Sequence, residues 1–158
     1  MRIANIKYND IVDGEGVCVS VWFQGCPHQC SGCHNPETWS FNGGYEIEYE
    51  ELEKQVLEAI ERNGIKRNLS LLGGEPLCEL NLEYAIKLAA AAKQKYPDIT
   101  IYCWTGYTLE QILKKYNNSI LKNIDVLIDG LFILSQRDIT LKLRGSTNQR
   151  ILYKNIDF

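Results

Sequence analysis

The 158-residue sequence predicts an α/β protein, an open, partial (β/α) barrel built around a parallel sheet. Two observations lead to this class. Short apolar segments with strand character alternate with longer amphipathic segments in the order β-α-β-α-β-α-β, which is typical of parallel strands joined by right-handed crossovers. A complete eightfold barrel takes about 250 residues, more than this chain has. We therefore expect a single domain, residues 1–158, whose sheet remains open.

The first predicted strand covers residues 17–23, and a helix over residues 46–63 follows it. The strand sequence VCVSVWF has a period of two, which fits a β-strand. It alternates Val17, Val19, Val21 and Phe23 with Cys18, Ser20 and Trp22. The helix ends at Gly64 and carries four apolar residues on one face. These four are Leu52, Val56, Ala59 and Ile60.

The second and third strands are expected at residues 68–72 (NLSLL) and 99–104 (ITIYCW), with a helix between them. Asn81 is a suitable N-cap for this helix, and Pro97 lies just beyond its expected end. Strand 99–104 is favoured by its β-branched and aromatic side chains. The residues expected on the inner face of the helix are Leu82, Ala85, Ile86 and Ala89.

The last predicted helix begins at Thr108, which forms a capping box with Gln111. A fourth strand is expected at residues 125–129 (DVLID), and a final one at residues 150–154 (RILYK). The apolar side of the helix comprises Leu109, Ile112, Leu113 and Tyr116.

Composition excludes several classes of function. The net charge is −3 and the sequence has no basic stripe, so no nucleic-acid partner is expected. No apolar run reaches the ~18 residues of a membrane span, and no secretion signal is recognisable, so we expect a cytoplasmic protein without membrane contact. Thiols stay reduced in the cytoplasm, and the six cysteines therefore indicate metal ligands or small buried residues rather than disulfides.

Three cysteines, Cys26, Cys30 and Cys33, lie close together in the segment GCPHQCSGCHN. Clustered thiolates in a reducing compartment indicate zinc or an iron–sulfur cluster. A zinc site would need a fourth ligand, for which His28 or His34 is available. We favour a [4Fe-4S] cluster, because zinc knuckles usually pair ligands from two separated hairpins and no second pair exists. One iron would then lack a protein ligand and could bind a small molecule. The cysteines expected to be buried in strands are Cys18 and Cys103.

Three other segments each follow a predicted strand: GGEP (73–76), TGY (105–107) and Asp129-Gly130. The carboxyl ends of parallel strands share one rim, where ligands bind. We therefore expect these segments to converge with the cysteine loop. Glycines let a ligand approach the strand edge closely, which suits a zwitterionic amino acid. On its own, GGEP also fits an ordinary tight turn before a helix.

The remaining residues near this rim allow two interpretations. Trp104 fits a core position better than a ligand contact. Tyr107 or Thr105 could edge a nucleoside pocket or belong to an ordinary turn, and Asp129 could bind ribose or simply cap a turn. The polar segment RGSTNQR (144–150) could be a solvated loop or a contact for a ligand or partner.

Two of these motifs together resemble a known family. Cys-x3-Cys-x2-Cys after the first predicted strand, with Gly-Gly-Glu-Pro after the second, resembles the radical S-adenosylmethionine enzymes. The segments DGEGV, LLGGEPL, WTGYT, VLIDGLF and RGSTNQ extend the resemblance from about Ile11 to Arg150. Among these enzymes, the chain is most similar to the short activating enzymes of anaerobic (class III) ribonucleoside-triphosphate reductase.

The resemblance implies a cofactor site. Cys26, Cys30 and Cys33 would hold one [4Fe-4S] cluster, and S-adenosyl-L-methionine would chelate the open iron through its amino and carboxylate groups. No side chain would act as a catalytic acid, base or nucleophile, because the cluster and S-adenosylmethionine carry the chemistry. The residues implied to contact S-adenosylmethionine are Gly32, Cys33, His34, Gly73, Gly74 and Glu75.

The resemblance also implies a reaction and two partners. A flavodoxin-like donor would reduce the cluster, and S-adenosylmethionine would be cleaved to methionine and a 5′-deoxyadenosyl radical. The radical would remove hydrogen from a glycine of the large reductase subunit, leaving a glycyl radical on that protein substrate. His34 stands where many relatives carry an aromatic residue, and we expect this difference to leave the mechanism intact.

Three other functions fit parts of the sequence. The chain could activate another glycyl-radical enzyme such as pyruvate formate-lyase, although WTGYT and RGSTNQ argue against this. It could be a non-catalytic zinc module that binds a partner. A ferredoxin that only carries electrons is disfavoured, because just three cysteines are clustered.

Overall fold

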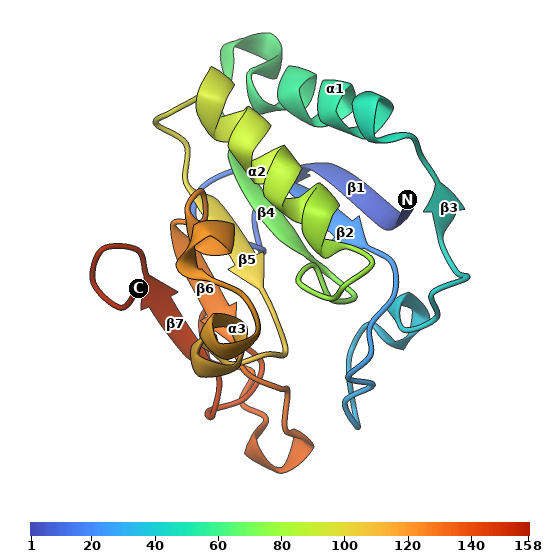
Figure 1. Ribbon diagram of the computed structural model, residues 1–158, viewed down its shortest axis with the longest axis vertical. Coiled ribbons are helices and arrows are strands. Elements are labelled where there is room, and N and C mark those ends of the chain that lie inside the picture. The colour runs from blue at the N-terminus through green and yellow to red at the C-terminus, as the bar shows by residue number, and fades with distance from the viewer.

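The computed structural model describes residues 1–158 as a mixed seven-stranded sheet with three α-helices (Figure 1). The strand order across the sheet is β3-β1-β2-β4-β5-β6-β7. The strands are β1 (Arg2–Asp10), β2 (Cys18–Phe23), β3 (Tyr45–Glu46), β4 (Asn68–Gly73), β5 (Ile101–Trp104), β6 (Val126–Asp129) and β7 (Arg150–Tyr153). The helices are α1 (Tyr49–Ile60), α2 (Leu82–Lys95) and α3 (Leu109–Lys115), with short 3-10 turns η1 (Pro36–Thr38), η2 (Arg62–Gly64), η3 (Asn118–Leu121) and η4 (Leu134–Gln136).

The four central strands, β2, β4, β5 and β6, are parallel and follow one another in chain order, as the alternation predicts. The edges differ from the expected parallel sheet. β1 pairs antiparallel with β2 and β3, and β7 pairs antiparallel with β6. β1 was not predicted, because only Ile3 and Ile6 of this strand are buried apolar residues. The fold is thus a mixed α/β sheet with antiparallel edges.

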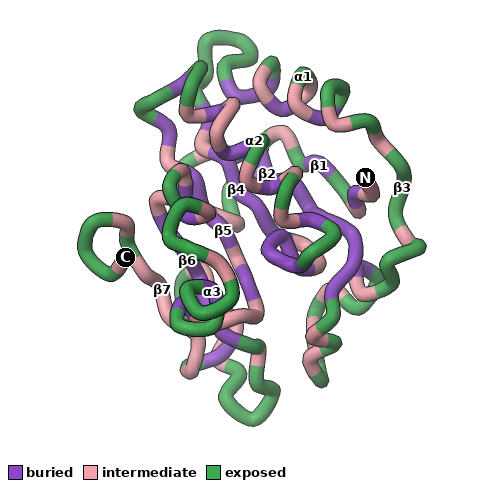
Figure 2. Tube along the Cα trace, viewed as in Figure 1, coloured by how far each residue is buried: buried purple, intermediate pink, exposed green.

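The helices cover one face of the sheet. Because consecutive parallel strands never reverse direction across the sheet, right-handed crossovers bring their helices to the same side. Figure 1 shows α2 and α3 in front of the sheet, with α1 beside α2. The main core lies here and contains Val19 and Phe23 from β2 and Leu69 from β4. Figure 2 shows buried strands and exposed outer helix surfaces.

The opposite face of the central strands carries a smaller and more polar set of side chains. The apolar cluster on this side is formed by Tyr102, Val126 and Ile128, with Trp104 packed against it. The β1–β2 loop also packs here, because a Cβ at Gly14 would lie 3.2 Å from Ser70 and Tyr102 atoms. The alternating side chains of the predicted strand 17–23 therefore lie on opposite faces of the sheet, but both faces are buried.

The three predicted helices exist, and α1 is shorter than the predicted range 46–63. Gln111 and Thr108 form the predicted capping box. Asn81 precedes α2 but does not cap it with its side chain, which donates instead to the carbonyls of Gln24 and Glu75, 3.0 Å from each. The prediction that Ile86 and Leu113 face inward is wrong, because Ile86 is only partly buried and Leu113 is 40% exposed. No helix combines the length and apolarity that a bilayer crossing requires.

The end of β6 is joined to α3 and β7 by a buried carboxylate. Asp129 accepts from the backbone N–H of Leu109 at 2.7 Å and from Nε of Arg150 at 2.9 Å. Arg150 also donates to both carboxylate oxygens of Glu110. Asp129 is 1% exposed, so this arginine neutralises an otherwise isolated buried charge.

Candidate functional site

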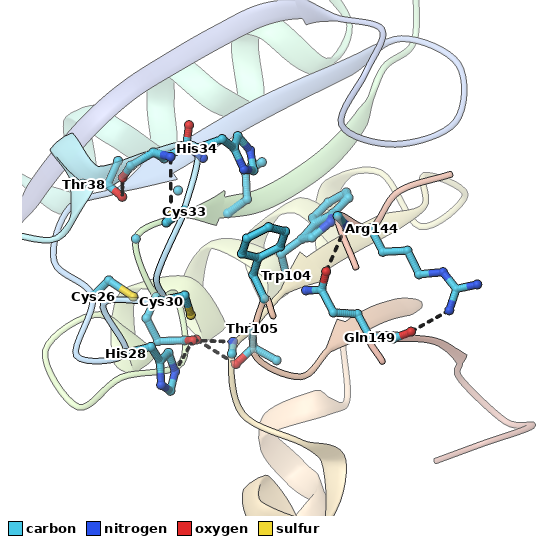
Figure 3. Close-up of a pocket in the computed structure, with 18 of the residues that line it drawn as sticks. Cys26, His28, Cys30, Cys33, His34, Thr38, Trp104, Thr105, Arg144 and Gln149 are labelled. Atoms are coloured by element: carbon cyan, nitrogen blue, oxygen red, sulfur yellow. Dashed lines mark hydrogen bonds and ion pairs between the residues drawn. The ribbon is translucent and has the colours of Figure 1, made fainter. Parts of the chain in front are cut away.

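A cavity of about 320 Å³ lies at the carboxyl ends of the parallel strands. The cysteine loop after β2 forms one wall, the turns after β4 and β5 form the base, and the segment between β6 and β7 forms the opposite wall. Figure 3 shows Cys26, Cys30 and His28 on one side and Arg144 and Gln149 on the other. The predicted convergence of the sequence motifs at one rim is confirmed.

The cysteine loop is fixed by backbone hydrogen bonds. The N–H of Cys26 donates to the carbonyl of Trp39 at 3.1 Å, and the N–H of Cys33 donates to the carbonyl of Cys30 at 3.0 Å. The N–H of Asn35 points at the sulfur of Cys33, 3.4 Å away. All three cysteines line the cavity. Backbone donors of this kind tune the sulfur ligands of iron–sulfur clusters.

Burial keeps the metal-free thiols of the cysteine loop in their neutral form. Burial raises the pKa of Cys26 to about 11 and raises the pKa of Cys30. Near neutral pH these thiols therefore stay protonated on their own, and a bound metal would have to displace their protons. No three His, Cys, Asp or Glu side chains are grouped tightly enough to hold a single metal ion.

The Gly-Gly segment extends the β2–β4 pairing beyond the strands themselves. The N–H of Gly74 donates to the carbonyl of Phe23 at 2.8 Å, and the N–H of Glu75 donates to the carbonyl of Gly25 at 2.9 Å. A Cβ at Gly74 would lie 2.4 Å from that same Gly25 oxygen. The two glycines line the cavity and also let the start of the cysteine loop lie directly against the end of β4.

Glu75 is fully buried and its carboxylate is surrounded by donors. One oxygen accepts from the Thr105 hydroxyl at 2.8 Å and from the Leu77 N–H at 2.9 Å. The other accepts from the Gly106 N–H at 2.7 Å and contacts Nε2 of His28 at 2.9 Å. The sequence shows each of these motifs separately, but it gives no sign that one carboxylate joins them.

The wall opposite the cysteines differs from the sequence expectation. Trp104 lines the cavity while also packing against the apolar cluster, and its indole N–H donates to the carbonyl of Leu143 at 2.7 Å. The segment 144–150 is not simply a solvated loop. Arg144 donates to the carbonyl of Gln149 at 2.6 Å, and the Gln149 side chain donates to the carbonyl of Gly130 at 3.0 Å. Both side chains line the cavity.

A pair of aspartates near the cavity is not evident from the sequence. Asp13 lines the cavity, and burial together with a hydrogen bond to Asp10 raises its pKa to about 7. Lys7 lies 3.8 Å from Asp10 and 3.9 Å from Asp13. The only sequence signal is the conspicuous DGEG turn, which does not reveal that the two carboxylates lie together.

Comparison with known proteins assigns the family. Residues 12–152 match the family model described as a 4Fe-4S single cluster domain. The chain is 41% identical over 143 residues to the anaerobic ribonucleoside-triphosphate reductase-activating protein of Haemophilus influenzae, covering 90% of this chain and 91% of that one. It is 36% identical over 141 residues to the same-named protein of Escherichia coli K12, covering 89% and 90%. The chain belongs to the anaerobic ribonucleoside-triphosphate reductase-activating protein family. A member from Enterobacteria phage T4 is 36% identical over 150 residues, covering 94% and 90%.

Membership in the reductase-activating protein family bears on the alternatives left open by the sequence. The family description supports an iron–sulfur cluster and thus disfavours a zinc module. The names of the relatives favour the reductase over pyruvate formate-lyase as the target.

The structure brings most of the candidate residues of this family member together. The three cysteines, His34, Gly73, Gly74 and Glu75 line one cavity. Gly32 lies in the same loop but outside the cavity lining, and the Leu134 side chain occupies the space beside it. Asp129 is also outside the lining, and its carboxylate is occupied by Leu109 and Arg150. A role for Asp129 in ribose binding is therefore not supported.

Proposed function

We propose that this chain is a radical S-adenosylmethionine enzyme that generates a glycyl radical on anaerobic ribonucleoside-triphosphate reductase. The observation that carries the proposal is the shared cavity, which is lined by all three cysteines of the loop and by the Gly73-Gly74 strand end. The cluster, when bound, supplies the electron that cleaves S-adenosylmethionine to methionine and the 5′-deoxyadenosyl radical. The protein's own part is to bind, orient and shield.

Cys26, Cys30 and Cys33 are proposed to hold the [4Fe-4S] cluster. Their number leaves one iron without a protein ligand, as a cofactor-chelating site requires. The backbone at Gly73 and Gly74 is proposed to pair with the methionine end of S-adenosylmethionine, beside Cys33 and His34. Gly32 is retained as a backbone contact in this proposal.

The partners and the finer fold type belong to the same proposal. The large subunit of the reductase is the protein substrate, and a flavodoxin-like protein supplies the electron. Residues 1–158 act as one radical-SAM domain, with the sheet curved as an open, partial barrel. The reductase would close its open side. In the segment 144–150, which is a candidate contact, one N–H of Arg144 bonds to the carbonyl of Gln149 and the Gln149 side chain bonds to Gly130.

The decisive experiment is anaerobic incubation of the iron-loaded protein with S-adenosylmethionine and a reductant. We expect 5′-deoxyadenosine in the mixture and a glycyl radical signal by electron paramagnetic resonance on the added reductase. Pyruvate formate-lyase serves as the comparison substrate and should remain without signal. A protein that contains iron and sulfide but never yields 5′-deoxyadenosine would contradict the proposal.

A further inference from the structure

The starting point is the saturation of the Glu75 carboxylate. A carboxylate offers about four lone-pair sites, and Glu75 has four donors within 2.9 Å. These donors come from three separate places in the chain: the cysteine loop, the turn after β4 and the turn after β5. No acceptor site of the carboxylate remains for a bound ligand, although the backbone of Glu75 still borders the cavity.

We propose that His28 and Glu75 form a clamp that positions the cysteine loop against the ends of β4 and β5. This inference rests on the proposed function and assigns Glu75 a positioning role instead of a direct side-chain contact to S-adenosylmethionine. His28 lies between Cys26 and Cys30, so its bond to Glu75 fixes the part of the loop that carries two cluster ligands. The clamp thereby sets the distance between the cluster and the Gly73-Gly74 edge.

The packing of Gly106 supports the clamp independently of the hydrogen bonds. A Cβ on Gly106 would lie 2.4 Å from Cδ2 and 2.7 Å from Nε2 of His28. Gly106 is not among the glycines with positive φ, so its backbone does not require glycine. The missing side chain instead makes room for the imidazole. Tyr107 holds the ring from another side, with centroids 4.5 Å apart and planes at 72°.

A second set of bonds makes the clamp stiff. Asn81 is buried, and its side-chain amide donates to the carbonyls of Gln24 and Glu75, 3.0 Å from each. The backbone of Glu75 is therefore tied to the residue before the cysteine loop, and its side chain is tied to the loop itself. A cofactor that must reach both an iron and the strand edge gains affinity when these two contacts are pre-positioned.

The test compares His28→Leu with His28→Gln in the iron-loaded protein. Glutamine keeps an N–H donor at similar reach, whereas leucine removes it. We expect His28→Leu to weaken S-adenosylmethionine binding about tenfold, close to the net contribution of one intramolecular hydrogen bond. It should also reduce the change that S-adenosylmethionine causes in the paramagnetic resonance spectrum of the reduced cluster. His28→Gln should restore both, at an iron content equal to that of the wild type.

Gly106→Ala is a second test of the clamp. It keeps the side chains of His28 and Glu75 and changes only the distance between them. It should weaken binding as His28→Leu does, and the double variant should be no worse than His28→Leu alone. If His28→Leu fails to load iron, Gly106→Ala decides the question, and unchanged affinity there would overturn the clamp. Wild-type affinity and spectrum in His28→Leu would also overturn it. A wild-type cluster that shows no response to S-adenosylmethionine would instead overturn the proposed function.

Discussion

Replacing Gly74 by alanine should destabilise the protein through the cysteine loop. The sequence suggests that a side chain here would block the cofactor, but the structure gives a more direct effect. The new Cβ would lie 2.4 Å from the carbonyl oxygen of Gly25, where ordinary contacts begin at 3.4 Å. The backbone neighbour would have to move by about 1 Å, since a carbonyl cannot rotate away as a flexible side chain can.

The magnitude follows from what this movement disturbs. Overpacking typically costs about 1–3 kcal/mol. The movement also strains the bonds from Gly74 to Phe23 and from Glu75 to Gly25, each worth about 1 kcal/mol. In the opposite direction, alanine lowers the conformational entropy of the unfolded chain, which stabilises the folded protein by about 0.4–1 kcal/mol. The expected net loss is about 2–4 kcal/mol, or roughly 5–15 °C in the unfolding midpoint for a chain of this size.

The assay compares thermal midpoints of the anaerobically prepared wild type, Gly74→Ala and Gly64→Ala. Gly64 has φ +69°, and a Cβ added there would have no atom within 4 Å, so alanine at this position adds only backbone strain, about 1–2 kcal/mol. Backbone conformation alone would make Gly64→Ala the worse variant, because Gly74 has no positive φ. Contact with the cysteine loop reverses this order. A midpoint for Gly74→Ala at or above that of Gly64→Ala would refute the reasoning.

Three further changes test other parts of the molecule. Cys30→Ala should prevent full cluster loading, whereas Cys103→Ala should keep iron and sulfide near wild-type levels; equal iron in the two variants would contradict the assigned ligands. Arg150→Met should lower the free energy of unfolding by about 1–3 kcal/mol, because buried Asp129 loses its partly exposed charged partner and keeps only the Leu109 N–H; a urea titration that finds less than about 0.5 kcal/mol would reject this. Folding raises the pKa of Asp13 from 3.8 to about 7, so the stability from its protonated form is complete below pH 3.8 and is lost as pH rises through about 7. Asp13→Asn should flatten this decline, and an unchanged slope would exclude Asp13 as its source.

The order of the central strands was predictable because each helix and strand carries its own local pattern. Leu52, Val56, Ala59 and Ile60 are all buried on α1 as their spacing predicts. β1 was missed because only two of its residues, Ile3 and Ile6, are buried and apolar, which is too few to form a recognisable pattern. Its polar side chains include Asn9, which accepts from Arg67, a partner far away in the sequence.

The candidate site was predictable only at the level of motifs. Their convergence follows from the rule that parallel strands share a carboxyl rim. The pairing of His28 with Glu75 and of Asp129 with Arg150 could not be predicted, because no local pattern records which side chains meet across the fold. The core prediction for Trp104 holds only in part, because its side chain packs against an apolar cluster and also lines the cavity, and hydrophobic character does not distinguish the two.

The separation of 47 residues between His28 and Glu75 has a consequence for biosynthesis. The cysteine loop leaves the ribosome well before the turns that hold it, and Gly106 emerges later still. Until then, the three thiols belong to a segment whose hydrogen-bond partners have not yet been synthesised. We therefore expect iron to be inserted after translation has passed Gly106, and chains truncated before that residue to load iron less completely than the full chain.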